Sequence, residues 1–272
     1  MAADRWLEVR CALFPRADGP GLFVPWPALQ AALAQWRAAG RYEQSFFVRK
    51  PPGLRLRFAG DDLGGRLEPV LLPWLTAAEG RNDLRSFRFS VYEPEEARFG
   101  GAVGMAIAHD AFDRDSSDAV LYESLPDDAR GGVGRLALSI AVTSDLLGRT
   151  LEDRAEVWDV WHRLGRRIGV ESSSPASQIM TPAEIEALAT GAVPEMAALD
   201  GGLRELVEQR IDHSAAVAKA VVAARDAGRL EVGLRSWLCA LIVFHWNRFG
   251  VTLELDALRS AVSGLCRVLE PD

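Results

Sequence analysis

The sequence has little of what three classes of protein need. Its 272 residues include only three cysteines, an odd number without a CxxC spacing, which excludes a disulfide framework or a zinc module. No stretch approaches the roughly 18 consecutive apolar residues of a membrane-spanning helix, and the opening residues, MAADRWLEVR, lack the apolar core of a signal peptide. A formal charge of −7 argues against a nucleic-acid binder that works through bulk positive charge. We therefore expect a soluble, cytoplasmic protein with no nucleic-acid or membrane partner.

What the sequence does have is a globular composition, with 49% hydrophobic and 25% charged residues. The chain is long enough to bury a core without a metal or disulfide. Up to Gly101 the pattern alternates between strands, predicted over residues 6–14, 45–50, 54–59 and 84–92, and helices, predicted over 27–39 and 63–77. This β-α-β-β-α-β order matches the ferredoxin-like split unit, an antiparallel sheet with two helices on one side.

After Gly100-Gly101 every periodic segment is helical. These segments lie near residues 103–123, 133–147, 152–168, 182–190, 203–228, 232–248 and 254–269. We therefore predict an α+β protein in which a ferredoxin-like sheet part, residues 1–101, packs against a largely helical part, residues 102–272, that closes an active-site cleft. No Pro/Ser-rich linker separates the two parts, so they are expected to form one compact unit.

The segment FFVRKPPGLRLRF, residues 46–58, carries the first candidate site. Its second strand places three apolar side chains on one face and Arg55 and Arg57 on the other. Two arginines on one face repel each other unless an anion lies between them, so the pair indicates a clamp for a carboxylate, a phosphate or a peptide carbonyl. The alternative is a solvated edge strand.

The segment SVYEPEEARFGG, residues 90–101, carries the second. Tyr92 lies at a strand end, and the loops after strands often hold functional groups. A tyrosine flanked by carboxylates can serve as a general acid, while Glu95 can pair with Arg98 or with the arginine strand. Ser90, two residues before the tyrosine, is a further candidate for substrate binding. The alternative is a turn with a salt bridge.

The segment LIVFHWNRFG, residues 241–250, ends an apolar helix. A histidine in an apolar run, here His245, is usually a core histidine with one satisfied hydrogen bond. Arg248 shares a helical face with it, and Trp246 and Asn247 follow it. The asparagine and the arginine stand at a helix end closed by Gly250, so they are also candidates for lining a cleft.

The remaining polar motifs do not form a metal or nucleotide site. Residues 113–124 begin like a calcium loop but lack its glycine and its final glutamate. His109, His162 and His213 have no second ligand at metal spacing, and GGVGR, residues 131–135, lacks a P-loop lysine. We expect no metal, nucleotide or flavin cofactor.

Three segments in this order resemble one known family. They are an aromatic-rich strand ending in LRLRF, then YEPEEARFGG, then a C-terminal helix with NRFG. Together they are similar to the small C-terminal domain of lantibiotic-type dehydratases, which also occurs in thiopeptide pathways. The resemblance spans nearly the whole chain, with its anchors at residues 46–58, 92–101 and 245–250.

The resemblance implies one of two activities on a ribosomally made precursor peptide. One eliminates glutamate from glutamylated Ser or Thr and leaves a dehydroamino acid. The other, pyridine synthesis, joins two dehydroalanines by a formal 4+2 aza-cycloaddition and expels water and the leader peptide. Carried over residue by residue, the family's arginine pair falls on Arg55 and Arg57, and its glutamate and arginine before the glycines fall on Glu95 and Arg98.

The departure from the eliminating members lies in the last motif. Those members place a histidine four residues before the asparagine, where this sequence has Val243, and the histidine here is His245. Two residues correspond to about 200° around a helix, so His245 cannot point where the eliminase histidine points. The RKPPG hairpin also replaces the longer Asp- and His-containing turn of eliminases. Both departures favour the pyridine synthase.

The sequence and the resemblance together predict a pyridine synthase of thiopeptide antibiotic biosynthesis without a cofactor. Its partner is a modified precursor peptide, a leader plus a dehydrated, azole-containing core, and residues 1–101 are expected to bind the leader. The catalytic candidates are Tyr92, His245 and Glu95, and the substrate-binding candidates are Arg55, Arg57, Arg98, Ser90, Trp246 and Asn247. A glutamate-eliminating lyase and a non-catalytic peptide-binding subunit are the alternatives.

Overall fold

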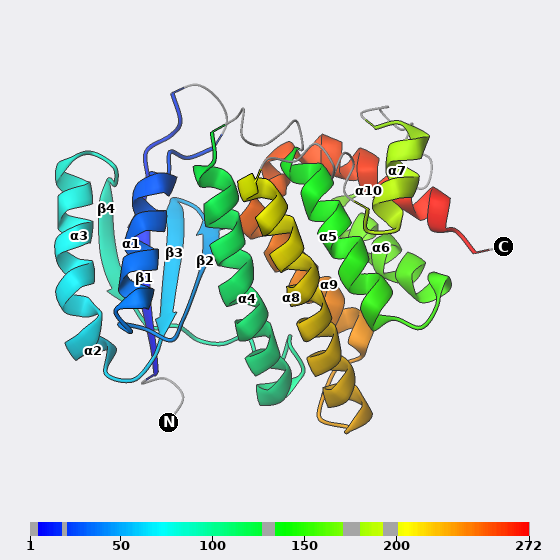
Figure 1. Ribbon diagram of the computed structural model, residues 1–272, viewed down its shortest axis with the longest axis horizontal. Helices are drawn as coiled ribbons and strands as arrows, with labels where there is room; N and C mark the ends of the chain where they lie inside the picture. Colours follow the sequence, from blue (N-terminus) through cyan, green and yellow to red (C-terminus); the bar gives the residue numbers. More distant parts are fainter. Residues whose placement is uncertain (1–4, 18–20, 127–133, 171–179, 193–200, 272) are drawn as a thin grey trace. The chain divides into compact units, whose positions relative to one another are not determined.

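The computed structural model describes residues 5–17, 21–126, 134–170, 180–192 and 201–271. The chain forms two compact units, which are described separately (Figure 1). The first comprises Met1–Pro94 and His109–Leu125, and the second comprises Glu95–Ala108 and Pro126–Asp272. One long helix, α4 (Gly101–Ser124), contributes its beginning to the second unit and the rest to the first. The division into folding domains at residues 1–101 and 102–272 stays a prediction.

A four-stranded antiparallel sheet forms the centre of the first unit. Its strands are β1 (Trp6–Ala12), β2 (Gln44–Lys50), β3 (Gly53–Ala59) and β4 (Ser86–Ser90), arranged in the order β2-β3-β1-β4. All four strands predicted from the sequence are confirmed. Because β3 lies between β2 and β1, the alternative of a solvated edge strand is wrong for Arg55 and Arg57.

Three helices of this unit lie between the strands in the sequence: α1 (Trp26–Ala38), α2 (Leu63–Arg66) and α3 (Glu68–Gly80). The single helix predicted over residues 63–77 is wrong in one respect, because the helix breaks at Leu67. Pro69 lies in the first turn of α3. A proline has no N–H and a fixed φ, which suits the start of a helix and not its middle.

One face of the sheet carries the core of this unit. The ring of Trp36 on α1 lies 6.4 Å from Phe58 on β3 and 5.8 Å from Trp74 on α3, measured between centroids. Figure 1 shows α1 over the strands with α3 beside it. Since successive side chains of a strand alternate between faces, Arg55 and Arg57 lie on the face opposite Phe58.

The later part of α4 runs along the outer edge of β2. The Asp113 carboxylate accepts a hydrogen bond from Ser45 N at 2.7 Å, and Ser116 Oγ accepts one from Phe47 N at 3.2 Å. Unpaired donors on an edge strand can pair with another chain, so these side chains close that edge. The same part of α4 brings His109 to the sheet.

The second unit is helical in the residues that the structure describes. Besides the start of α4 it contains α5 (Arg135–Thr150), α6 (Arg154–Ile168), α7 (Pro182–Ala189), α8 (Gly201–Asp226), α9 (Leu234–Phe249), a short 3-10 turn (Val251–Glu254) and α10 (Leu255–Leu269). The helices predicted after Gly101 are confirmed to within a few residues. Helix α9 ends where Gly250 takes a left-handed φ of 71°. Among the described helices, none combines the length and the apolarity that crossing a bilayer requires.

All three cysteines are free thiols. Burial raises the pKa of Cys11 on β1 to about 12. It also raises the pKa of Cys239 on α9 and of Cys266 on α10, each to about 11. Because the thiolate is the nucleophilic form, the raised pKa leaves all three side chains weakly nucleophilic at neutral pH.

Candidate functional site

The centre of the candidate site is a carboxylate shared by two arginines. Glu8 on β1 stands opposite Arg57 on β3, and its Oε2 accepts a hydrogen bond from Arg57 Nε at 2.8 Å. Its Oε1 accepts one from Arg10 Nε, also at 2.8 Å. Only 1% of Glu8 and 8% of Arg57 are exposed. Burial raises the pKa of Glu8, but the hydrogen bonds from Arg10 and Arg57 outweigh it and hold that pKa below its usual range.

Arg57 in turn lies against Tyr92, which follows the end of β4. Its guanidinium carbon is 4.2 Å from the centroid of the Tyr92 ring and 5.2 Å from that of Phe46, which is cation–π geometry. The Tyr92 hydroxyl forms a 2.9 Å hydrogen bond with Nε2 of His109. Tyr92 is 4% exposed and His109 is 9% exposed. Glu8, Arg57, Tyr92 and His109 therefore form one connected group in the first unit, which we call the Tyr92 cluster.

The environment of His109 keeps its imidazole neutral. The ring lies 4.5 Å from that of Trp6 and 5.8 Å from that of Phe46. Burial, and then the charge of Arg57, lower the pKa of His109 to about 4. At neutral pH, His109 Nε2 therefore either accepts a hydrogen bond from the Tyr92 hydroxyl or donates one to its oxygen, according to the histidine tautomer. A phenol bonded to a neutral imidazole and placed beside a cation is equipped for proton transfer.

The lowered pKa of His109 should make stability depend on pH. Its folded-state value of about 4 lies below the ordinary histidine value of 6.5, so the unfolded chain binds the proton more readily. The stability linked to this group is complete above pH 6.5 and is lost as the pH falls towards 4. Between pH 8 and pH 5 the loss should be about 2 kcal/mol of the free energy of unfolding, measured by urea denaturation.

The control for this titration is His109→Gln, which keeps a hydrogen-bonding group beside Tyr92 but does not titrate. Other ionisable groups contribute equally to both proteins, so the variant should lose about 2 kcal/mol less than the wild type over the same pH interval. Equal losses in the two proteins would contradict a buried neutral imidazole.

The two other residues predicted for a site in this unit lie on the same sheet face. Ser90 on β4 stands opposite Glu8 on β1. Arg55 lies two residues from Arg57 along β3 and stands opposite Arg10. The structure therefore brings together all four of the predicted site residues that belong to the first unit.

Glu95 and Arg98 belong to the second unit and form an ion pair with each other. Arg98 Nη1 lies 2.6 Å from Glu95 Oε2, and both side chains are exposed. Gly100 follows with a φ of 73°, and a Cβ there would come within 2.9 Å of Val232. A side chain at Gly100 would therefore be strained and crowded, which agrees with the tight backbone predicted at the two glycines. The geometry is that of a turn with a salt bridge, the alternative considered for this segment, and a catalytic role for Glu95 stays a prediction.

His245 is buried on α9. Its Nε2 lies 2.8 Å from Ser139 Oγ on α5, and its ring centroid lies 4.7 Å from that of Phe249. Trp246 is also buried, with its ring stacked on a second tryptophan at 6.5 Å, whereas Asn247 is half-buried. These surroundings are those of a core histidine bonded to a hydroxyl, and a role for these three residues in the reaction stays a prediction.

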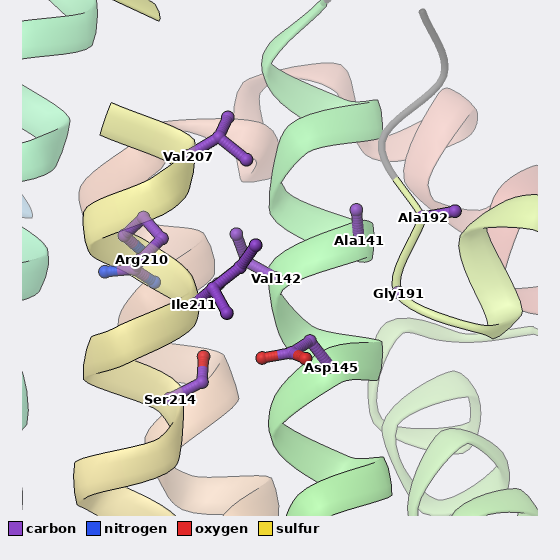
Figure 2. A pocket seen from close by; sticks show the side chains of 9 residues that line it. All are labelled: Ala141, Val142, Asp145, Gly191, Ala192, Val207, Arg210, Ile211 and Ser214. Atoms are coloured by element: carbon purple, nitrogen blue, oxygen red, sulfur yellow. The ribbon is translucent and has the colours of Figure 1, made fainter. Parts of the chain in front are cut away.

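A hollow in the second unit lies between α5, α8 and the turn after α7 (Figure 2). Its volume is about 160 Å³, and its lining is apolar except for Asp145, Arg210 and Ser214. None of the predicted site residues lines it, so it is not assigned to the reaction. Among the described residues, no group of three or more His, Cys, Asp or Glu side chains is arranged to hold a metal ion.

Sequence reasoning missed Glu8 and His109. Glu8 belongs to the polar side of a half-buried strand, and its partner becomes visible only when the pairing of β1 with β3 is known. In the sequence, His109 stands out only as a possible metal ligand, and it has no second ligand at metal spacing. Its signal was its place on the buried side of a helix, three residues before the buried Phe112.

Comparison with known proteins places the chain in a family. Residues 27–262 match the family described as lantibiotic biosynthesis dehydratase C-term. Among solved structures, the chain is similar to the tRNA dependent lantibiotic dehydratase MibB from Microbispora sp. 107891, with a TM-score of 0.70 at 19% sequence identity. That match covers 97% of this chain and 28% of the other, so this chain spans less than a third of its length. No curated protein matches the chain. Because the family match extends over most of its length, the chain belongs to the lantibiotic dehydratase C-terminal domain family.

Proposed function

We propose that this protein is a pyridine synthase of thiopeptide maturation. It joins two dehydroalanines of a modified precursor peptide by a formal 4+2 aza-cycloaddition and then expels water and the leader peptide. Membership of the family supports an enzyme of ribosomal peptide maturation that acts on a precursor peptide. The choice of reaction within the family rests on the chain's own residues.

The observation that carries this choice is the identity of residue 243 on α9. Eliminating members, according to the resemblance, have a histidine at this position, whereas this chain has the half-buried Val243. The one histidine of α9, His245, is about 200° further round the helix and is bonded to Ser139. At position 243 this chain therefore lacks the histidine that the elimination reaction uses.

The Tyr92 cluster supplies the proton transfers that the cycloaddition needs. One amide must adopt an iminol-like form, with a proton moved from nitrogen to oxygen, and the later loss of water needs a proton on the leaving oxygen. The Tyr92 hydroxyl donates a proton to the substrate oxygen, and the proton that the substrate gives up from nitrogen restores the phenol, directly or through the neutral His109 to which the hydroxyl is bonded. The Arg57 cation, 4.2 Å from the phenol ring, stabilises the negative charge that develops on the phenol oxygen.

Positioning of the substrate supplies the larger part of the rate enhancement. Two dehydroalanines held at near-attack distance gain about 7–11 kcal/mol from orientation alone. His245 and Glu95 are the further candidates for proton transfer. Of the residues predicted to hold the peptide, Arg55 and Ser90 lie on the sheet face of the Tyr92 cluster. Arg98, Trp246 and Asn247 belong to the second unit, and their part in binding stays a prediction.

We also propose that the sheet of the first unit is a ferredoxin-like split β-α-β unit and that it binds the leader peptide. The antiparallel order β2-β3-β1-β4, with α1 on the apolar face and α3 beside it, supports this classification. In the described sheet β4 is an outer strand, which is where an extended peptide can add as a further strand.

The second candidate function is glutamate elimination. It is favoured by the family's two arginine and glutamate motifs, which are present as Arg55, Arg57, Glu95 and Arg98. A non-catalytic peptide-binding subunit is the third candidate.

An assay with two peptides distinguishes the three candidate functions. Both peptides carry the same leader; one core holds dehydroalanines and azoles, and the other holds glutamylated serine. A pyridine synthase should consume only the first and release a pyridine-containing macrocycle and a leader ending in a carboxamide, both identified by mass. Because the reaction involves no net redox change, no cofactor should be needed.

Two other results would contradict the proposal. Release of free glutamate from the second peptide, with the first left intact, would assign the lyase. Binding of the leader with both cores unchanged would assign the non-catalytic subunit.

A further inference from the structure

Three arginines stand side by side across three strands of the sheet. Arg10 on β1 stands opposite Arg55 on β3 and also opposite Arg88 on β4. Neighbouring strands are about 4.8 Å apart, so this arginine row (Arg55, Arg10 and Arg88) extends about 10 Å across the sheet. Like charges placed directly opposite on neighbouring strands repel each other and destabilise a sheet. The row therefore costs stability unless an anion compensates it.

The protein's own carboxylates compensate the row only in part. Glu8 bonds to Arg10, but its second oxygen is occupied by Arg57. In the part of the chain that the structure describes, neither Arg55 nor Arg88 has a carboxylate within ion-pair distance. Burial, and then the charge of Arg10, lower the pKa of Arg55, which is the direction expected of a cation among cations. Arg88 is exposed, and Arg10 and Arg55 are partly exposed, so the row is open to a ligand.

We propose that the arginine row binds an acidic, extended segment of the peptide substrate through the carboxylates of that segment. This inference rests on the proposed function, because it takes the ligand to be part of the same precursor peptide. A guanidinium group matches a carboxylate with two parallel hydrogen bonds, and three of them in a row accept more than one acidic side chain.

The position of the row supports this partner. Arg55 is two residues from Arg57 on β3, which is about 7 Å along a strand, and Arg57 touches Tyr92. A peptide whose reacting residues reach Tyr92 therefore also reaches the row. Dehydroalanines and azoles are uncharged, so the reaction itself does not account for three cations. The formal charge of −7 for the whole chain disfavours a long polyanion such as nucleic acid as the occupant.

Fluorescence anisotropy with the full chain tests the inference without any turnover. The probes are two labelled peptides of equal length, fluorescein-Gly-Glu-Ala-Glu-Ala-Glu-Gly-amide and its counterpart with glutamine in place of glutamate. The glutamate probe should bind at least about tenfold more tightly than the glutamine probe, since charge-assisted hydrogen bonds are the strong ones. Raising NaCl from 50 to 500 mM should weaken binding of the glutamate probe several-fold, because salt screens charges that are partly exposed.

Variants in the row identify the binding surface. Arg88→Gln and Arg10→Gln should each weaken binding of the glutamate probe by about tenfold. The matched control is Arg85→Gln, because Arg85 directly precedes β4 but lies outside the row, with its guanidinium carbon 6.0 Å from the Phe14 ring centroid. This variant should leave the affinity unchanged. Arg88 is exposed, so its replacement does not disturb the core.

Three results would overturn the inference: equal affinity for both probes, equal effects of Arg88→Gln and Arg85→Gln, or tighter and row-dependent binding of a labelled oligothymidylate. The last would make the partner a nucleic acid. Since anisotropy needs no reaction, loss of cyclisation with intact probe binding would refute the proposed function alone. Intact cyclisation with no preference for the glutamate probe would refute the arginine row alone.

Discussion

Replacing Tyr92 by phenylalanine should slow cyclisation by about 10²–10⁴-fold, the usual effect of removing a positioned acid or base. The variant keeps the ring against which Arg57 packs and removes only the hydroxyl bonded to His109. Substrate affinity should change far less than the rate of the bound complex. Single-turnover kinetics with the dehydroalanine peptide, quantified by mass spectrometry, measures the effect.

The matched control is Tyr42→Phe. Tyr42 is a second buried tyrosine of the same unit, and its hydroxyl donates a 2.9 Å hydrogen bond to the Leu33 carbonyl. Both replacements remove one buried hydrogen bond and should cost a similar stability, about 1 kcal/mol. Only Tyr92→Phe should impair the reaction. If the two variants turn over equally fast, Tyr92 has no part in the chemistry.

Replacing Glu8 by glutamine should lower the free energy of unfolding by about 3–5 kcal/mol. The substitution keeps the shape of the side chain but leaves the buried Arg57 without its carboxylate. A buried cation without a partner is among the most destabilising defects that a single substitution creates. Urea denaturation at pH 7, followed by tryptophan fluorescence, measures the loss.

Two further variants make the result specific. Glu43→Gln removes a carboxylate from the exposed Arg5–Glu43 pair and should cost less than about 1 kcal/mol. The double variant Glu8→Gln with Arg57→Met removes both buried charges and should be more stable than Glu8→Gln alone. A cost for Glu8→Gln as small as that for Glu43→Gln would show that the pair carries little stability.

Local patterns predicted much of the fold and part of the site. Strand alternation placed Arg55 and Arg57 on one face, because the period of side chains along a strand is fixed by the backbone. Helical periodicity predicted α4 to α10, because the helical backbone likewise fixes the period at which apolar side chains share a face. The sequence alone could not decide whether His245 is a core residue or a cleft residue, since both interpretations place a histidine on an apolar helix. The bond to Ser139 became visible only with α5 in place.

What the sequence could not predict depends on contacts between distant segments. Glu8 and Arg57 are far apart in the chain and become partners only because β1 pairs with β3 in one particular register. The arginine row depends on two such registers at once, those of β1 with β3 and of β1 with β4. His109 joins Tyr92 because α4 packs against β2, and nothing in either local pattern indicates that packing.

The buried thiols have a consequence for the chemistry proposed here. Dehydroalanine is an electron-poor alkene, and both candidate reactions expose the protein to it, as product or as substrate. Thiolates add readily to such alkenes, so a reactive cysteine near the peptide would become alkylated. At pH 7 a thiol with a pKa of about 11, as for Cys239 and Cys266, is ionised in only about one molecule in ten thousand, and Cys11 is ionised still less. Under the proposed function, burial of these thiols would therefore protect the protein from covalent capture by the dehydroalanines of its peptide over repeated turnovers.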